Sequence, residues 1–123
     1  MVVLRDCVIE GNTTAANGAG IHMAAPSTCP MGAGYGLEIH DSRIAGNILS
    51  NNGESTSPKA GGGIYLPSTA NPMCGSLNYT FRMQNTVVES NKIIGLEADQ
   101  NWQPTGAGIY FDGMGIPPNW NPE

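Results

Sequence analysis

The sequence predicts an all-β chain that winds as a right-handed parallel β-helix solenoid of about three coils with long loops. Three observations predict this fold. Apolar and polar residues alternate with a period of two, two short blocks recur three times in the same order, and glycine-rich dipeptides precede the strand of the second block each time. The 123 residues form a single β-helix segment, with coils expected at about 1–36, 37–80 and 81–123.

The first block has one pattern in all three copies: alternating apolar residues, then a small residue, a branched aliphatic residue and an asparagine. The copies are VVLRDCVIEGN at 2–12, LEIHDSRIAGN at 37–47 and FRMQNTVVESN at 81–91. Alternation places the apolar residues on one face of a strand, and stacking the copies sets like residues over one another. The aligned Asn12, Asn47 and Asn91 are therefore predicted to form an inward ladder of amide hydrogen bonds along the axis.

The second block begins with small residues and continues into an alternating strand. Its copies are GAGIHM at 18–23, GGGIYL at 61–66 and GAGIYF at 106–111. Glycine favours a bend and disfavours a helix, so each copy is expected to turn and then enter a strand. Stacking places Ile21, Ile64 and Ile109 in one inward column, and stacked coils bury a core that no single coil could bury.

Both blocks carry short motifs that recur in register. They are Ile9-x-x-Asn12, Ile44-x-x-Asn47 and Val88-x-x-Asn91, with the tetrads GAGI, GGGI and GAGI. These motifs resemble repeats of polymorphic outer-membrane-protein type and, more broadly, pectate-lyase-like right-handed β-helix surface proteins. The repeats of the narrower family usually read Phe-x-x-Asn and Gly-Gly-Ala-Ile, so this chain departs by an aliphatic residue in place of the aromatic one. The resemblance covers nearly the whole chain and implies secretion, surface display and, commonly, adhesion.

The composition argues against two classes of partner. Ten acidic and five basic residues give a formal net charge of −5, which offers no general attraction to nucleic acid or to anionic lipid. No apolar run approaches the ~18 residues that a membrane-spanning helix needs. We therefore expect no nucleic-acid partner and no membrane span.

The three cysteines indicate a compartment. Cys29 and Cys74 occupy similar proline-containing segments after the second block, so a disulfide between equivalent loops of adjacent coils is predicted. A disulfide implies an oxidising compartment, and hence an extracellular or cell-surface location. Cys7 falls on the inward small position shared with Ser42 and Thr86, which predicts a buried free thiol. Because CxxC spacing is absent, we expect no zinc site, and we expect no other cofactor.

Aromatic residues supply the candidate ligand-binding site. The outward position after each stacked isoleucine holds His22, Tyr65 or Tyr110, and rings ~4.8 Å apart could stack on sugar rings. Cross-strand ring pairs also stabilise a sheet by ~0.2–1 kcal/mol without any ligand, and we favour this structural role.

Two long segments, 48–60 and 92–105, follow the asparagines of the second and third coils and are expected to leave the winding as loops at one corner. Solenoids commonly carry binding on such insertions, and Trp102 adds an aromatic candidate there. The alternative is that the loops only cover the flank of the core. Asn78 begins an Asn-x-Thr pattern and is the candidate acceptor for N-linked sugar.

A polar column is expected at Asp6, Asp41 and Asn85. Two carboxylates on adjacent coils would suit calcium or acid–base chemistry, as in β-helix polysaccharide enzymes. A solvated column is the favoured interpretation, because no denser carboxylate cluster accompanies them. His40 and Asp41 form at best a weak dyad, because neighbouring strand residues point to opposite faces. No catalytic residue is assigned.

Together these features predict a non-catalytic extracellular structural or adhesive module. Uncapped coils expose unpaired backbone groups, so the chain is expected to belong to a longer solenoid or to stack end to end into filaments. The segment 116–123 is the candidate cover for the last coil. A host surface or a polysaccharide is the expected ligand class. The alternative function is a carbohydrate-active β-helix enzyme or a polysaccharide-binding protein.

Overall fold

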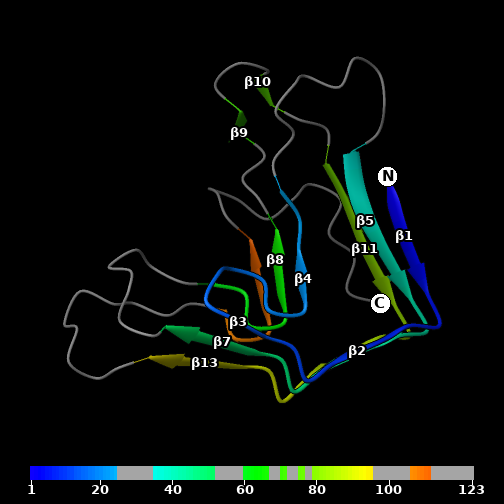
Figure 1. Ribbon diagram of the computed structural model, residues 1–123. Helices are drawn as coiled ribbons and strands as arrows, with labels where there is room; N and C mark the ends of the chain where they lie inside the picture. The colour runs from blue at the N-terminus through cyan, green and yellow to red at the C-terminus, as the bar shows by residue number, and fades with distance from the viewer. Residues whose placement is uncertain are drawn as a thin grey trace.

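The computed structural model describes residues 1–24, 35–51, 60–66, 70–71, 75–76, 79–95 and 106–111. Within these ranges every regular element is a β-strand. Four parallel sheets of three strands each wind into a parallel β-helix of about three coils, which confirms the predicted fold class (Figure 1). Among the described residues, no helix has the length and apolar character needed to cross a membrane.

Each coil contributes one strand to each of the four sheets. The first coil contains β1 (Val2–Arg5), β2 (Val8–Glu10), β3 (Thr13–Thr14) and β4 (Ile21–His22). The second contains β5 (Tyr35–His40), β6 (Arg43–Ala45), β7 (Ile48–Asn51) and β8 (Ile64–Leu66). The third contains β11 (Tyr79–Gln84), β12 (Val87–Glu89), β13 (Lys92–Gly95) and β14 (Ile109–Phe111). A short antiparallel pair, β9 (Ala70–Asn71) and β10 (Gly75–Ser76), lies between the second and third coils in the sequence.

The second coil supplies the middle strand of each of the four parallel sheets. The strand orders are β1-β5-β11, β2-β6-β12, β3-β7-β13 and β4-β8-β14, and the strands of each set run side by side in Figure 1. The register sets like residues opposite one another, so that Ile64 pairs with both Ile21 and Ile109. Each interior position therefore continues as a column through the three coils.

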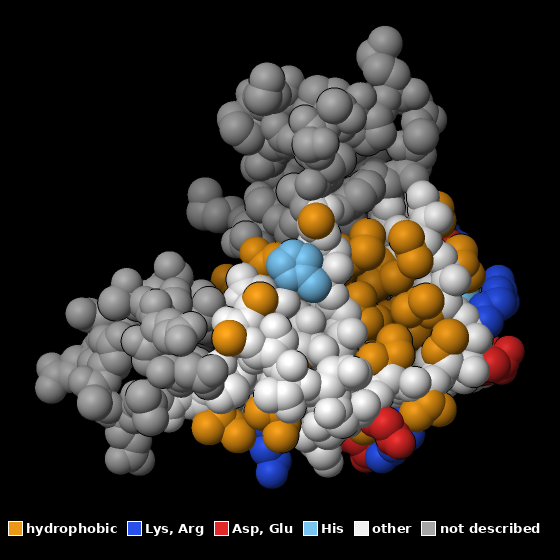
Figure 2. All heavy atoms as spheres, viewed as in Figure 1, with side chains coloured by type: hydrophobic (Ala, Val, Ile, Leu, Met, Phe, Trp, Pro, Cys, Tyr) orange, Lys and Arg blue, Asp and Glu red, His pale blue; other side chains and the backbone are white. Residues whose placement is uncertain are grey.

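The core lies inside the winding, and the second coil supplies most of its fully buried members. These members are Leu37, Ile39, Ile44, Ile64, Leu66 and Phe81. The outer coils pack against them with partly buried counterparts, which are Leu4, Ile9, Ile21 and Met23 in the first coil and Met83, Val88, Ile109 and Phe111 in the third. Burying one such side chain completely stabilises a fold by ~1.5–3 kcal/mol, so the end coils realise only part of that gain. Figure 2 shows hydrophobic side chains gathered in the open interior between β1 and β4.

The corner between the first and second strand of each coil turns through a residue in the left-handed region. These residues are Asp6, Asp41 and Asn85, with φ values of 52°, 49° and 47°. Aspartate and asparagine are among the non-glycine residues that adopt this conformation most readily, because their short polar side chains bond locally. Nδ2 of Asn85 donates a hydrogen bond to Oδ1 of Asp41 at 3.1 Å. The requirement for a left-handed turn therefore accounts for the polar column.

Two further corners repeat this conformation in every coil. They use Gly11, Gly46 and Ser90 before the third strand, and Gly18, Gly61 and Gly106 before the fourth. A Cβ at Gly61 would lie 2.6 Å from the carbonyl oxygen of Ile64, so this corner needs glycine for space as well as for its φ of 71°. The glycine-rich start of the second block is therefore a tight turn, as the sequence predicted.

The chain continues along the winding after the asparagines, where the sequence predicted that loops would leave it. Strands β7 and β13 pair with each other, and β7 also pairs with β3, so that the coil gains another face. The paired Thr14, Leu49 and Ile93 are its less exposed positions, and Leu49 is fully buried. The long segments 48–60 and 92–105 therefore begin as strands. A two-residue alternation of this kind is too short to recognise without the pairing partner.

Candidate functional site

The most developed polar feature of the interior is the asparagine ladder formed by Asn12, Asn47 and Asn91. Asn47 is fully buried, and its Nδ2 donates to Oδ1 of Asn91 at 2.9 Å. Its own Oδ1 accepts from Nδ2 and from the backbone N–H of Asn12, at 2.9 and 3.1 Å. The backbone N–H of Asn47 likewise donates to Oδ1 of Asn91 at 3.0 Å. Nδ2 of Asn47 also donates to the carbonyl of Ile9, and Nδ2 of Asn91 to that of Ile44, at 3.0 and 2.9 Å.

The asparagine ladder has a direction. Each amide oxygen that is bonded accepts from the preceding coil, and Asn47 and Asn91 each also donate to a carbonyl of the preceding coil. At the third coil, the backbone N–H of Asn91 and one hydrogen on its Nδ2 have no acceptor among the described residues. At the first coil, Oδ1 of Asn12 has no donor among them. One end of the ladder therefore offers donors and the other end offers an acceptor.

A glycine column, Gly20, Gly63 and Gly108, lies against the asparagine ladder. A Cβ built on Gly63 would lie 2.5 Å from the carbonyl oxygen of Gly108 and 2.9 Å from Nδ2 of Asn91. A Cβ on Gly20 would meet Gly63 and Asn47 at 2.6 and 3.0 Å. Adjacent coils approach too closely here for any side chain, so this column permits the close coil spacing on which the ladder depends. The repeated Gly-x-Gly of the second block carried this signal, but nothing in the sequence links this motif to the asparagines.

The predicted ring column forms on the outer face of the sheet β4-β8-β14. The ring centroids of His22 and Tyr65 are 5.0 Å apart at an interplanar angle of 34°, and those of Tyr65 and Tyr110 are 5.7 Å apart at 21°. Nδ1 of His22 lies 2.8 Å from the carbonyl oxygen of Asn17. Because neighbouring rings stack on one another, the ring faces between His22 and Tyr65 and between Tyr65 and Tyr110 are covered within the column. This geometry suits sheet stabilisation better than the binding of sugar rings.

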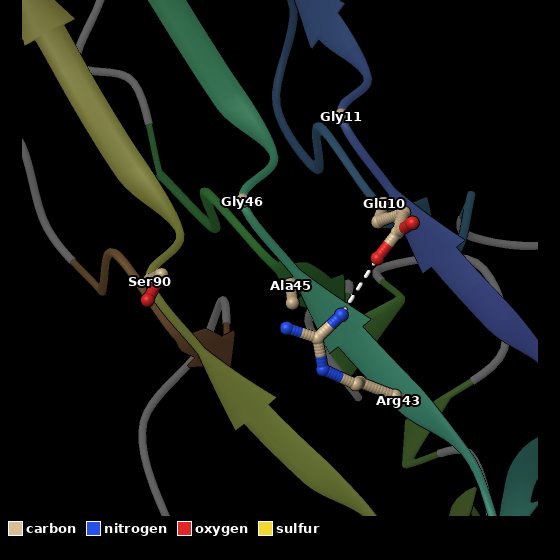
Figure 3. A pocket seen from close by; sticks show the side chains of 6 residues that line it. All are labelled: Glu10, Gly11, Arg43, Ala45, Gly46 and Ser90. Atoms are coloured by element: carbon tan, nitrogen blue, oxygen red, sulfur yellow. Dashed lines mark hydrogen bonds and ion pairs between the residues drawn. The ribbon is translucent and has the colours of Figure 1, made fainter.

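An arginine bridge, formed by Arg43 with Glu10 and Glu89, spans all three coils on the outer face of the sheet β2-β6-β12. Nη1 of Arg43 lies 2.6 Å from Oε2 of Glu10, and Nη2 lies 3.0 Å from Oε1 of Glu89. Figure 3 shows Arg43 reaching toward Glu10 past Ala45, which is 3% exposed. A shallow hollow of about 280 Å³ surrounds the bridge, lined by Glu10, Gly11, Arg43, Ala45, Gly46 and Ser90. Exposed ion pairs contribute only ~0–1 kcal/mol each to stability. The main effect of the bridge is therefore to align the three coils with one another.

The arginine bridge was not predicted from the sequence. Its members stand at different positions of the repeat, because Glu10 and Glu89 are each two residues beyond the position of Arg43. A comparison of like positions in the three copies therefore misses a diagonal contact. Opposite charges on outward positions of adjacent coils were the signal that could have revealed it.

The surroundings of His40 agree with the sequence analysis, whereas those of Cys7 differ from it. Nε2 of His40 lies 3.5 Å from Oε2 of Glu38 on the same strand, whereas Asp41 bonds along the corner, so the structure brings no His40–Asp41 pair together. Cys7 is a free thiol, and its Sγ lies 3.1 Å from the carbonyl oxygen of Arg5. It is half-buried, where the sequence predicted full burial, because its position is in an end coil that is covered on one side only.

Four predicted site residues, Cys29, Cys74, Asn78 and Trp102, lie outside the described residues, so the disulfide, the sugar acceptor and the loop site stay predictions. In the part of the chain that the structure describes, no group of three or more His, Cys, Asp or Glu residues is placed to hold a metal ion.

Comparison of the chain with protein-family models, with curated proteins and with solved structures finds no match. The functional argument therefore depends on the geometry of the coils.

Proposed function

We propose that this chain is a non-catalytic structural module that acts outside the cell or on its surface. The observation that carries the proposal is that the recurring polar residues maintain the winding. Asp41 and its counterparts turn a corner, Asn47 and its counterparts join the coils, and Arg43 bridges all three coils. A solenoid held in this way is a stiff support that presents its outer faces and its insertions to a partner, which suits a structural or adhesive role.

The extracellular part of the proposal is supported by the resemblance of the repeats to polymorphic outer-membrane-protein-type and pectate-lyase-like surface proteins. The pairing expected for Cys29 and Cys74 would also require an oxidising compartment. Labelling intact cells of the source organism with a membrane-impermeant amine reagent tests the location. We expect the protein to be labelled without lysis, and labelling only after lysis would exclude a surface role.

Polysaccharide binding is the second candidate, and the continuous row of His22, Tyr65 and Tyr110 is the observation that favours it. Because the rings cover one another, replacing Tyr65 by alanine is expected to lower the free energy of unfolding by ~0.5–1.5 kcal/mol. Urea denaturation followed by circular dichroism measures this change, and Tyr65→Phe is the matched control, since it keeps the ring.

Affinity electrophoresis in gels that contain polysaccharides decides between the two roles of the ring column. We expect the native protein and Tyr65→Ala to migrate alike in every gel. Retardation of the native protein that Tyr65→Ala abolishes, and that Tyr65→Phe retains, would establish sugar binding in its place.

A catalytic role is tested by incubating the protein with acidic and neutral polysaccharides and assaying reducing and unsaturated ends. No release is expected. Release that is lost in Asp41→Asn would overturn the non-catalytic proposal, because asparagine keeps the left-handed corner, as Asn85 does, while it removes the carboxylate.

A further inference from the structure

The two end coils are complementary in the hydrogen bonds that their described residues make. Among these residues, the backbone N–H and one Nδ2 hydrogen of Asn91 in the third coil have no acceptor, and Oδ1 of Asn12 in the first coil has no donor. Within the chain, the same atoms join Asn12 to Asn47 and Asn47 to Asn91 at 2.9 to 3.1 Å. A first coil placed on the third coil would therefore repeat a junction that the chain already makes twice.

We propose that copies of this chain stack head to tail, with the third coil of one copy against the first coil of the next. The proposal rests on the structural function proposed above and names its partner as a second copy of the chain. In this junction Asn91 donates to Oδ1 of Asn12 in the second copy, and Nδ2 of that Asn12 donates to the carbonyl of Val88. Both contacts continue the pattern that Asn47 makes within the chain.

The apolar residues of the two ends match in the same register. Each partly buried residue of the third coil would cover its counterpart in the first coil of the next copy, in the pairs Met83–Leu4, Val88–Ile9, Ile109–Ile21 and Phe111–Met23. On the outer face, the exposed Val87 and Val8 would also become neighbours. The edge strands of both coils would gain parallel partners for backbone groups that face no other strand of the described residues.

The polarity of the ladder selects one orientation. In a contact between two third coils, the donors of Asn91 would face each other and the strands would be antiparallel. In a contact between two first coils, the acceptors of Asn12 would face each other. Only the head-to-tail junction keeps the strands parallel and satisfies Asn12 and Asn91 together. A contact of this kind does not close on itself, so it produces an open filament.

One pair opposes the junction. Glu89 of one copy would lie beside Glu10 of the next without an intervening arginine, although each is already bound to Arg43 of its own copy. Assembly should therefore strengthen with added sodium chloride, which screens like charges.

Gly108→Ala tests the junction without disturbing the single chain. Among the described residues, a Cβ on Gly108 would meet only Cγ1 of Val88 at 3.9 Å, which is ordinary contact. In the stack the same Cβ would face the carbonyl of Gly20 in the second copy, as a Cβ on Gly63 would face Gly108 at 2.5 Å. The substitution is expected to raise the dissociation constant by about tenfold or more.

Sedimentation velocity over a wide range of concentrations measures assembly of the 123-residue chain, and circular dichroism measures its fold. We expect the native chain to form species that grow with concentration, Gly108→Ala to shift toward monomer with an unchanged spectrum, and the control Ile48→Val, on the outer face of the second coil, to assemble like the native chain. A native chain that stays monomeric at every concentration would overturn the proposal. So would Gly108→Ala assembling as well as the native chain.

Glu10→Gln provides a test in the opposite direction. It removes one of the two facing charges and keeps a polar group for Arg43, so the dissociation constant at low salt should fall about two- to fivefold. Weaker assembly of this variant would contradict the predicted register. These outcomes are independent of the polysaccharide assays, so a chain that proves monomeric and inactive would refute the stacking and leave the structural function standing.

Discussion

Replacing Asn47 by leucine is expected to lower the free energy of unfolding by about 3 kcal/mol or more. Asn47 is fully buried, and the substitution removes the acceptor of the Asn12 backbone N–H and the donor to the carbonyl of Ile9. Each buried polar group that is left without a partner costs about 1–3 kcal/mol, and the branched leucine side chain would also press on Gly20. Small domains are stable by only about 5–15 kcal/mol, so this loss is a large share of the total.

Urea denaturation of Asn47→Leu and Asn12→Leu, followed by circular dichroism, measures the contribution of the ladder. Asn12 is exposed at the end of the ladder, and its side chain makes one of the ladder bonds, so its replacement should cost about 1 kcal/mol or less. A loss of about 1 kcal/mol or less for Asn47→Leu as well would mean that the asparagine ladder does not stabilise the fold. Denaturation is best measured at low concentration, where the chains are separate.

Gly63→Ala is the second substitution with a large expected effect, a loss of about 2–4 kcal/mol in the free energy of unfolding. The added methyl group would lie 2.5 Å from the carbonyl oxygen of Gly108 and 2.9 Å from Nδ2 of Asn91. Neither group can move without separating the second and third coils, so the clash would also weaken the ladder bonds of Asn47 and Asn91.

Gly108→Ala is the matched control for Gly63→Ala, because it is the same substitution at the equivalent position of the end coil. Among the described residues its Cβ makes only an ordinary contact, so at low concentration, where the chains are separate, the midpoint of thermal unfolding should stay close to that of the native chain. Equal losses at Gly63 and Gly108 would show that the effect comes from the local backbone and that the coil spacing plays no part.

The fold was predictable because its strongest determinants repeat. Ile21, Ile64 and Ile109 stand at equivalent positions of three similar blocks, and their alternation with polar residues fixes both the strand and the face. The structure sets Asn12, Asn47 and Asn91 in register for the same reason. When the coils stack in strict register, the residues of one column occupy aligned positions of the repeats and can be recognised in the sequence.

The features that escaped prediction are those without such a column. The face that contains Thr14, Leu49 and Ile93 mixes a polar with two aliphatic residues over very short strands, and only pairing reveals it. The arginine bridge joins Arg43 to residues two positions further along the neighbouring coils, a diagonal relation that depends on side-chain length. The left-handed corners are formed by aspartate, asparagine, serine or glycine. Because the residue type differs from corner to corner, the shared backbone conformation cannot be recognised from the sequence.

The uniform corners also divide each winding into a segment of fixed length and a segment of variable length. The stretches 2–12, 37–47 and 81–91 each contain 11 residues, whereas the connections from asparagine to the next glycine corner differ widely. Adding one residue within a fixed stretch would turn every later side chain of that strand from the interior to the solvent. Adding residues to the connection between an asparagine and the next glycine corner would leave the register of the fixed stretches unchanged. Foreign peptides grafted for display, or new specificities acquired in evolution, are therefore expected in these connections.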